Sequence, residues 1–234
     1  MVSSKVRYIR EILTLKAGSL IMAVNDGKTI VIFSNIKGIY EMVYDGILIG
    51  LIVGFIRAGF LNGLIAISNV RIKGGLIFPV LLILQFAMFY IQEKVQFFAD
   101  ISGYFYIVVY ITGLYLLWLN RHEKGFGFIF AGVALNFVVM IVNNGRMPVS
   151  LEAASVLEPI YLQMLQSGTA VTKHFLMDSS TSLPFLGDII PLSSPYPRTQ
   201  AISVGDVIMN FGMFIYLQKI MLEEKIRTSL VETQ

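Results

Sequence analysis

The sequence predicts an all-α fold, a polytopic transmembrane helical bundle of about five spans with a long outward-facing loop region. Of its 234 residues, 56% are hydrophobic and 14% are charged, whereas an ordinary soluble domain is about 45–50% apolar and about 25% charged. The mean hydropathy is +0.72. Apolar segments of 13 to 19 residues recur along the chain, separated by short gaps with basic or aromatic edges.

Five of these segments approach the length of a membrane span, because a helix that crosses a bilayer core needs about 20 mostly apolar residues. They are residues 44–56, 76–91, 104–119, 126–142 and 204–222. The third has aromatic residues at both ends, as interfacial anchors do. Residues 57–75, between the first two segments, form a basic amphipathic stretch that we expect to lie along the membrane interface.

The basic residues between the segments predict the topology, because cytoplasmic loops carry an excess of Lys and Arg. One side receives a dense set, namely Arg57, Arg71, Lys73, Arg121, Lys124, Lys219, Lys225 and Arg227. The other side receives Lys94, Arg146, Lys173 and Arg198, spread over far more chain. We therefore expect a protein of the inner (cytoplasmic) membrane with a cytoplasmic C-terminus and with residues 143–202 facing outward.

Residues 1–41 form an N-terminal extension that fits this topology worse than the helical membrane domain, residues 42–234. Within the extension, SLIMAVNDGKTIVIFSN is typical of a strand, an Asn-Asp-Gly turn and a second strand. Six basic residues there would break the charge rule if they lay outside. Either a small soluble hairpin is held inside by an extra crossing, or the biological start is Met42, which we favour.

Composition excludes several kinds of site. The chain has no cysteine, so it forms no disulfide, thiolate nucleophile or cysteine-based metal site. Its two histidines, His122 and His174, are far apart in the sequence, and this spacing does not indicate a histidine-rich metal site. We expect no metal, no cofactor and no nucleic-acid partner; membrane lipid is the expected partner, and the oligomeric state stays open.

Asp206 stands in the first turn of the last predicted span, and Asn210 follows one turn later on the same face. Ionisable residues at membrane depth usually face the bundle interior or a water-filled cavity. Ser203 and Asp206 also match an N-cap residue and an acidic residue at the third helical position. Helix capping alone therefore remains an alternative to a functional role.

Asp188 lies between Gly187 and a short apolar run, eighteen positions before Asp206. The loop between the two aspartates can return the chain to the same corner of the bundle. Two carboxylates that share a site do not easily both ionise, so one becomes a general acid and the other a general base around one water. The alternative for Asp188 is a turn aspartate that binds nearby backbone amides.

Other polar residues complete the predicted outward cluster. Asn136 and Asn143 lie on one face of the fourth span, where a hydrogen bond between helices is the alternative to substrate support. Arg146 is expected to pair with Asp188 or Asp206, or to bind a lipid phosphate. The substrate-binding or structural cluster is therefore predicted to comprise Asn136, Asn143, Asn144, Arg146, His174, Ser203 and Asn210, beside the candidate catalytic residues Asp188 and Asp206.

From about residue 44 to residue 222 the chain resembles an uncharacterised bacterial family of small multi-pass membrane proteins, domain-of-unknown-function family 5317. The resemblance rests on NNGRMPVS, on the region of His174, on FLGDIIPL and on ISVGDVIMNFG. This family implies no assigned activity.

The segments LGDII and SVGDVIMNFG are also similar to those that carry the catalytic aspartates of lipoprotein signal peptidases, which are four-helix membrane aspartyl proteases. This resemblance implies catalytic roles for Asp188 and Asp206 alone. The chain departs from that pattern because Ser203 stands near the place of an expected asparagine and the loop after the fourth span is longer.

These observations lead to one hypothesis and two rivals. The hypothesis is a membrane-embedded, aspartyl-peptidase-like hydrolase whose substrate, a membrane-anchored protein or a lipid, arrives laterally from the bilayer. The first rival is a non-enzymatic accessory or transport protein that binds an ion or a lipid headgroup with the same cluster. The second is a scaffold that binds a partner through its outer loop.

Overall fold

The computed structural model describes residues 22–23, 29–30, 34–92, 94–167 and 173–232, and the chain separates into two compact units, Met1–Glu41 and Met42–Gln234. In the first unit, β1 (Met22–Ala23) pairs antiparallel with β2 (Thr29–Ile30), with Met22 opposite Ile30. The two strands agree with the predicted hairpin. The Asn-Asp-Gly turn lies outside the described residues.

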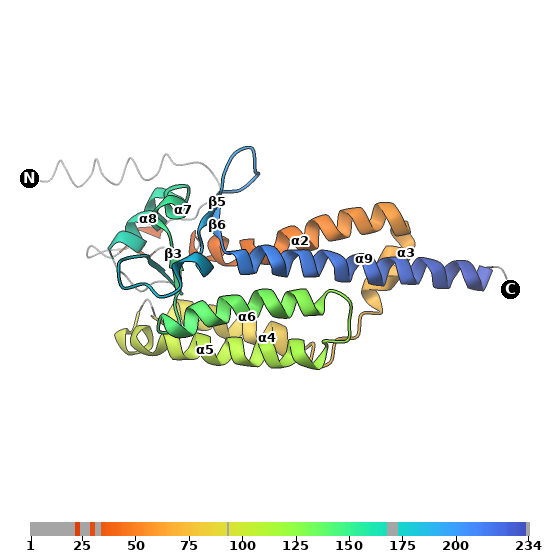
Figure 1. Ribbon diagram of the computed structural model, residues 1–234, viewed down its shortest axis with the longest axis horizontal. Coiled ribbons are helices and arrows are strands. Elements are labelled where there is room, and N and C mark those ends of the chain that lie inside the picture. The colour runs from red at the N-terminus through yellow and green to blue at the C-terminus, as the bar shows by residue number, and fades with distance from the viewer. Residues whose placement is uncertain (1–21, 24–28, 31–33, 93, 168–172, 233–234) are drawn as a thin grey trace, which may run out of the picture. The chain divides into compact units, whose positions relative to one another are not determined.

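The second unit is mostly helical, as predicted (Figure 1). Its long helices are α2 (Ser34–Ala58, which begins before the unit boundary), α4 (Ile77–Gln92), α5 (Gln96–Leu119), α6 (Phe126–Val142) and α9 (Val204–Glu232). Each contains or closely matches one predicted apolar segment. The interfacial stretch contains a short helix, α3 (Phe60–Ser68).

By length and composition, α5 is the one helix in the described part of the chain that is long and apolar enough to cross a membrane. The helices α4 and α6 are apolar but shorter, at 16 and 17 residues. A bundle of five spans therefore stays a prediction.

The helices α6 and α9 approach each other closely at glycines. A Cβ atom on Gly132 would lie 2.3 Å from the carbonyl oxygen of Gly205, and one on Gly212 would lie 2.7 Å from that of Gly125. Leu117, from α5, packs with apolar side chains of both helices around this contact. This packing fixes the start of α9 against the middle of α6.

The segment predicted as a long outer loop contains regular structure. It holds β3 (Met147–Val149), α7 (Leu151–Ser155), α8 (Pro159–Gln166), β4 (His174–Leu176), the 3₁₀ turn η1 (Pro184–Leu186), β5 (Ile190–Leu192) and β6 (Gln200–Ile202). Strand β3 pairs with β4 in parallel, and β5 pairs with β6 antiparallel. Helix α8 begins at Pro159, because proline is favoured in the first turn of a new helix.

A small apolar core holds the segment from β3 to β6 together. Val149, Ala153, Ala154 and Leu165 are buried against one another. The Ser150 hydroxyl accepts a hydrogen bond from Ala153 N and caps α7. The core therefore anchors β3, which carries the site on its two sides.

Candidate functional site

Strand β3 lies between two partners that bring distant residues together. On one side β4 pairs with it, so that Met147 stands opposite His174. On the other side Asp188 bridges to Val149. The amide of Asp188 donates to Pro148 O at 2.9 Å, and its carbonyl accepts from Ser150 N at 3.1 Å. Backbone hydrogen bonds therefore fix Asp188 and His174 beside the same short strand.

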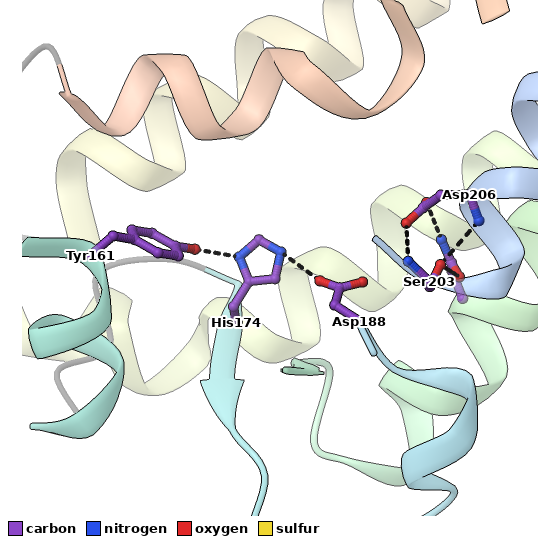
Figure 2. Close-up of polar contacts among 6 residues, drawn as sticks. Tyr161, His174, Asp188, Ser203 and Asp206 are labelled. Atoms are coloured by element: carbon purple, nitrogen blue, oxygen red, sulfur yellow. Dashed lines mark hydrogen bonds and ion pairs between the residues drawn. The ribbon is translucent and has the colours of Figure 1, made fainter. Parts of the chain in front are cut away.

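Three side chains from this segment form a continuous polar row (Figure 2). The His174 Nε2 atom lies 3.5 Å from Asp188 Oδ2. The Tyr161 hydroxyl, carried by α8, lies 2.8 Å from His174 Nδ1. The row thus links α8, β4 and the bridge to β3, three elements that are separate in the sequence.

The carboxyl group of Asp188 is buried and only partly satisfied. The residue is 1% exposed, and its Oδ1 atom has no hydrogen-bond partner among the described residues. Leaving a buried acceptor unpaired costs about 1–3 kcal/mol. An unpaired buried oxygen in a folded protein usually binds a water, a proton or a ligand.

Burial raises the pKa of Asp188 well above its ordinary value, and the negative charge of Asp206 raises it further. The positive charge of Lys173 acts in the opposite direction. For His174, burial and then the charge of Lys173 lower the pKa to about 3. The imidazole is therefore neutral at physiological pH, and its contact with Asp188 is not an ion pair, although the distance alone would allow one.

Lys173 supplies the positive charge within the site. Its ammonium nitrogen lies 6.0 Å from the centre of the Tyr110 ring. Burial alone would lower the pKa of Lys173, but the neighbouring Tyr110, Asp188 and Asp206 raise it above its ordinary value. The side chain therefore stays protonated, and its positive charge lowers the pKa of Asp188 against the effect of Asp206.

Asp206 has a different environment, because both of its carboxylate oxygens are occupied. Its Oδ2 atom accepts from Ser203 N at 2.8 Å, and its own amide donates to Ser203 Oγ at 3.0 Å. This reciprocal pair is the capping box that the sequence allowed. Asn136 Nδ2 donates to Asp206 Oδ1 at 2.8 Å, and Ser203 Oγ donates to Asn136 Oδ1 at 2.8 Å.

The two aspartates interact through their charges, and no hydrogen bond joins their carboxyl groups in the described part of the chain. Figure 2 shows them as separate groups, with Asp188 at the end of the tyrosine–histidine row and Asp206 beside Ser203. A water shared between the two carboxylates therefore stays a prediction.

Two other predicted asparagines, Asn143 and Asn210, form hydrogen bonds with backbone groups. Asn143 Nδ2 donates to Val139 O and to Ser182 O, while Asn143 Oδ1 accepts from Ser182 N, which ties the turn before η1 to the end of α6. Asn210 Nδ2 donates to Asp206 O, and Asn210 Oδ1 accepts from Gly46 N of α2. Asn144 is exposed in the left-handed conformation, with φ of 56°.

Arg146 differs from the expectation that it pairs with an aspartate of the site. Its Nη2 atom donates to Ala99 O and to Ser102 Oγ, both at 2.9 Å. These acceptors lie on the first two turns of α5, which begins eight residues before the predicted apolar segment. The early start of α5 explains why the sequence did not identify them.

Two functional candidates were missed in the sequence, Tyr161 and Lys173. Lys173 precedes His174 directly, but a single lysine in an outer loop gives no signal of burial. Tyr161 is one of several apolar or aromatic residues in an amphipathic stretch. The pairing of β3 with β4 places His174 and the preceding Lys173 beside β3, and α8 brings the Tyr161 hydroxyl to His174.

Within the described residues no group of three or more His, Cys, Asp or Glu side chains is arranged to hold a metal ion. The polar row and the capping box instead offer proton donors and proton acceptors, with the charge of Lys173 acting on Asp188.

Residues 69–218 match the model of a family of unknown function, DUF5317. The chain belongs to this family. An uncharacterized protein from Thermotoga maritima is 35% identical over 103 residues, which are 44% of this chain and 55% of the relative. The chain thus spans about half the length of that relative. No solved structure matches, and the family carries no activity that supports the resemblance to lipoprotein signal peptidases.

Proposed function

We propose that this protein is an integral membrane hydrolase in which Asp188 activates the attacking water. The observation that carries this proposal is the Asp188 carboxyl group, which is buried, touches a neutral histidine through Oδ2 and leaves Oδ1 unpaired. Burial and the charge of Asp206 raise the pKa of this carboxyl group, which favours the proton uptake that a general acid–base catalyst needs.

Exposed apolar surface supports the membrane placement. Large hydrophobic side chains are exposed on α2, α3, α4, α5, α6 and α9, and they include Ile52, Leu61, Ile83, Val108, Phe128 and Phe211. Monomeric soluble proteins rarely expose contiguous apolar patches larger than a few hundred Å². In this proposal α2, α4, α5, α6 and α9 are the five spans, in the cytoplasmic membrane, with a cytoplasmic C-terminus.

Helix length agrees with this assignment in part. At about 1.5 Å per residue, α4 and α6 span roughly 24–26 Å, a little less than the hydrocarbon core of about 30 Å. Short spans are accommodated by local thinning of the bilayer or by flanking residues that reach the interface. At the end of α5, the Arg121 guanidinium lies 4.6 Å from the centre of the Trp118 ring, and aromatic and basic residues of this kind are typical of a membrane interface.

The proposed reaction is hydrolysis of an amide or ester carbonyl in a membrane-anchored protein or a lipid. Ionised Asp188 takes one proton from water while the water oxygen bonds to the carbonyl carbon, which becomes a tetrahedral oxyanion. The oxyanion then collapses, the bond to the leaving amine or alcohol breaks, and the protonated Asp188 returns its proton to that group. Lys173 is the nearby cation that stabilises the negative charge.

Asp206 has a supporting role in this proposal, because both of its oxygens are occupied in the capping box. Its fixed negative charge keeps the pKa of Asp188 high. The symmetric dyad expected from the resemblance to signal peptidases therefore becomes an asymmetric pair, with one acid–base residue and one fixed charge.

Hydrolysis by proteoliposomes tests the proposal. The probes are a fluorescence-quenched peptide with one membrane-spanning segment and a fluorogenic diacylglycerolipid ester. For a probe that the wild type hydrolyses, Asp188→Asn is expected to lower the rate by about 10²-fold or more. Asp178→Asn, at a fully exposed aspartate, is the matched control and should leave the rate unchanged. Equal rates for the wild type and Asp188→Asn would contradict the proposal.

A second candidate is a non-enzymatic protein that binds a proton or a cation at the same cluster. The full engagement of Asp206 favours it, because only one carboxyl group is left to react. Proteoliposomes loaded with a pH-sensitive dye distinguish the two. Proton flux that Asp188→Asn abolishes, without hydrolysis of either probe, would support the non-enzymatic role.

A further inference from the structure

A short helix with an exposed apolar face marks the end of unit 2 opposite to the outward segment (Figure 1). Helix α3 starts after Gly59, whose φ of 88° turns the chain away from α2. Its buried residues, Gly63 and Ala66, face α9, where a Cβ atom on Gly63 would lie 2.5 Å from Met221 Cε. The exposed large side chains of the helix are Phe60, Leu61, Leu64, Ile65 and Ile67.

Basic side chains from three segments surround this end, and we call them the basic rim: Arg57, Arg71, Lys73, Arg121 and Lys124. All five are exposed. Asn120 fixes the turn that carries Lys73, because its Oδ1 accepts from Lys73 N at 2.9 Å and its Nδ2 donates to Lys73 O at 3.0 Å. These two bonds hold the turn before α4 against the end of α5.

The charge of the basic rim is not neutralised within the described residues. Two carboxylates pair with other cations. Glu123 Oε2 lies 2.7 Å from Lys219 Nζ, and Glu224 Oε2 lies 3.7 Å from Arg227 Nη1. No carboxylate of the described chain lies within ion-pair distance of a rim residue. Positive charge and exposed apolar surface therefore occur together at this end.

We propose that α3 and the basic rim form a binding surface for anionic phospholipid headgroups. The apolar side chains of α3 insert among the acyl chains, while the rim binds the phosphate groups above them. This combination fits a lipid better than a nucleic acid or an acidic protein, because it joins cations to a helix lying in the interface. The inference rests on the membrane placement proposed above and is independent of hydrolysis.

A site-resolved quenching experiment tests it, and the absence of cysteine makes single labels simple. A fluorophore is attached to Leu64→Cys on α3 or, as a control, to Tyr104→Cys on the exposed face of α5 near its outer end. Each protein is reconstituted in phosphatidylcholine vesicles with equal fractions of brominated phosphatidylglycerol or brominated phosphatidylcholine. We expect the label at position 64 to be quenched more by the anionic lipid, and the label at position 104 equally by both.

Charge variants connect this preference to the basic rim. The triple variant Arg71→Gln, Lys73→Gln and Arg121→Gln should abolish the preference for anionic lipid at position 64. Each charge removed should lower the relative affinity for anionic lipid about fivefold. The backbone bonds to Asn120 do not involve the Lys73 side chain, so the turn is retained. Lys94→Gln with Arg198→Gln, at basic residues outside the rim, should preserve it.

Equal quenching at position 64 by the two brominated lipids, or a preference that survives the triple substitution, would overturn the inference. A label at position 104 that neither lipid quenches would overturn the membrane placement itself. The two failures are therefore distinguishable.

Discussion

The Nε2 atom of His174 lies 3.5 Å from Oδ2 of Asp188, although the two residues are separated by fourteen positions and approach β3 from opposite sides. The Tyr161 hydroxyl contacts the other ring nitrogen. A neutral imidazole held at both nitrogens fixes the direction of one Asp188 oxygen and leaves the second available. This arrangement is the basis of the proposed chemistry.

The burial of His174 predicts a loss of stability in acid. Its pKa is about 3 in the folded protein, against an ordinary value of 6.5. Between these values the unfolded chain binds a proton that the folded protein does not, so the free energy of unfolding falls as the pH drops from 6.5 towards 3. We expect His174→Gln to flatten this part of the curve, as measured by thermal unfolding in detergent. An unchanged dependence of stability on pH in His174→Gln would contradict the lowered pKa of His174. His122→Gln, at an exposed histidine, is the control.

The raised pKa of Asp188 predicts that this residue's contribution to stability falls as the pH rises. Because its pKa is raised in the folded protein, its contribution to stability is present at low pH and is lost as the pH rises from 3.8 through the raised value. Asp188→Asn stays neutral throughout. We therefore expect this variant to have a higher melting temperature than the wild type in alkaline buffer, and a lower one there would contradict the raised pKa of Asp188.

The capping box predicts that Asp206 matters for stability as well as for charge. In Asp206→Asn one of the two donors, Ser203 N or Asn136 Nδ2, faces an NH₂ group in place of an oxygen. We expect a loss of about 1–3 kcal/mol in the free energy of unfolding. Ser150→Ala, which removes the simple cap of α7, should cost about 1 kcal/mol. An unchanged free energy of unfolding in Asp206→Asn would contradict the buried hydrogen bonds of Asp206 with Ser203 and Asn136.

Two glycines of α6 give a matched test of the contact between α6 and α9. A Cβ atom on Gly132 would lie 2.3 Å from Gly205 O, whereas one on Gly127 has nothing within 4 Å. Gly132→Ala should therefore destabilise by about 1–3 kcal/mol, and Gly127→Ala should stabilise by up to about 1 kcal/mol. Chemical unfolding in detergent measures both, and equal effects would contradict the close approach of the helices.

The helices were predicted better than the site. The bounds of α6 match the predicted segment, and α4 differs by one residue at each end. By contrast, α2, α5 and α9 extend well beyond their apolar segments. An apolar run predicts only the apolar part of a helix. The helix itself continues into polar sequence wherever backbone hydrogen bonds and packing allow it.

For the site, the sequence identified Asp188, Asp206 and the capping alternative, because local spacing defines a helix start. It did not identify Tyr161 or Lys173, and its alternatives for Arg146, an aspartate of the site or a lipid phosphate, did not include Ala99 and Ser102 of α5. These contacts depend on the pairing of β3 with β4 and on the early start of α5. Both features lie in stretches that the apolar pattern described as loop or left unassigned.

A comparison that needs no known substrate tests most directly whether Asp188 performs hydrolysis in the membrane. Cells that lack the native protein are supplied with the wild type, Asp188→Asn or Asp178→Asn at equal membrane levels, and their membrane proteins and lipids are compared by mass spectrometry. We expect a cleaved protein or lipid product that the wild type and Asp178→Asn generate and Asp188→Asn does not. Identical product profiles from all three would contradict it.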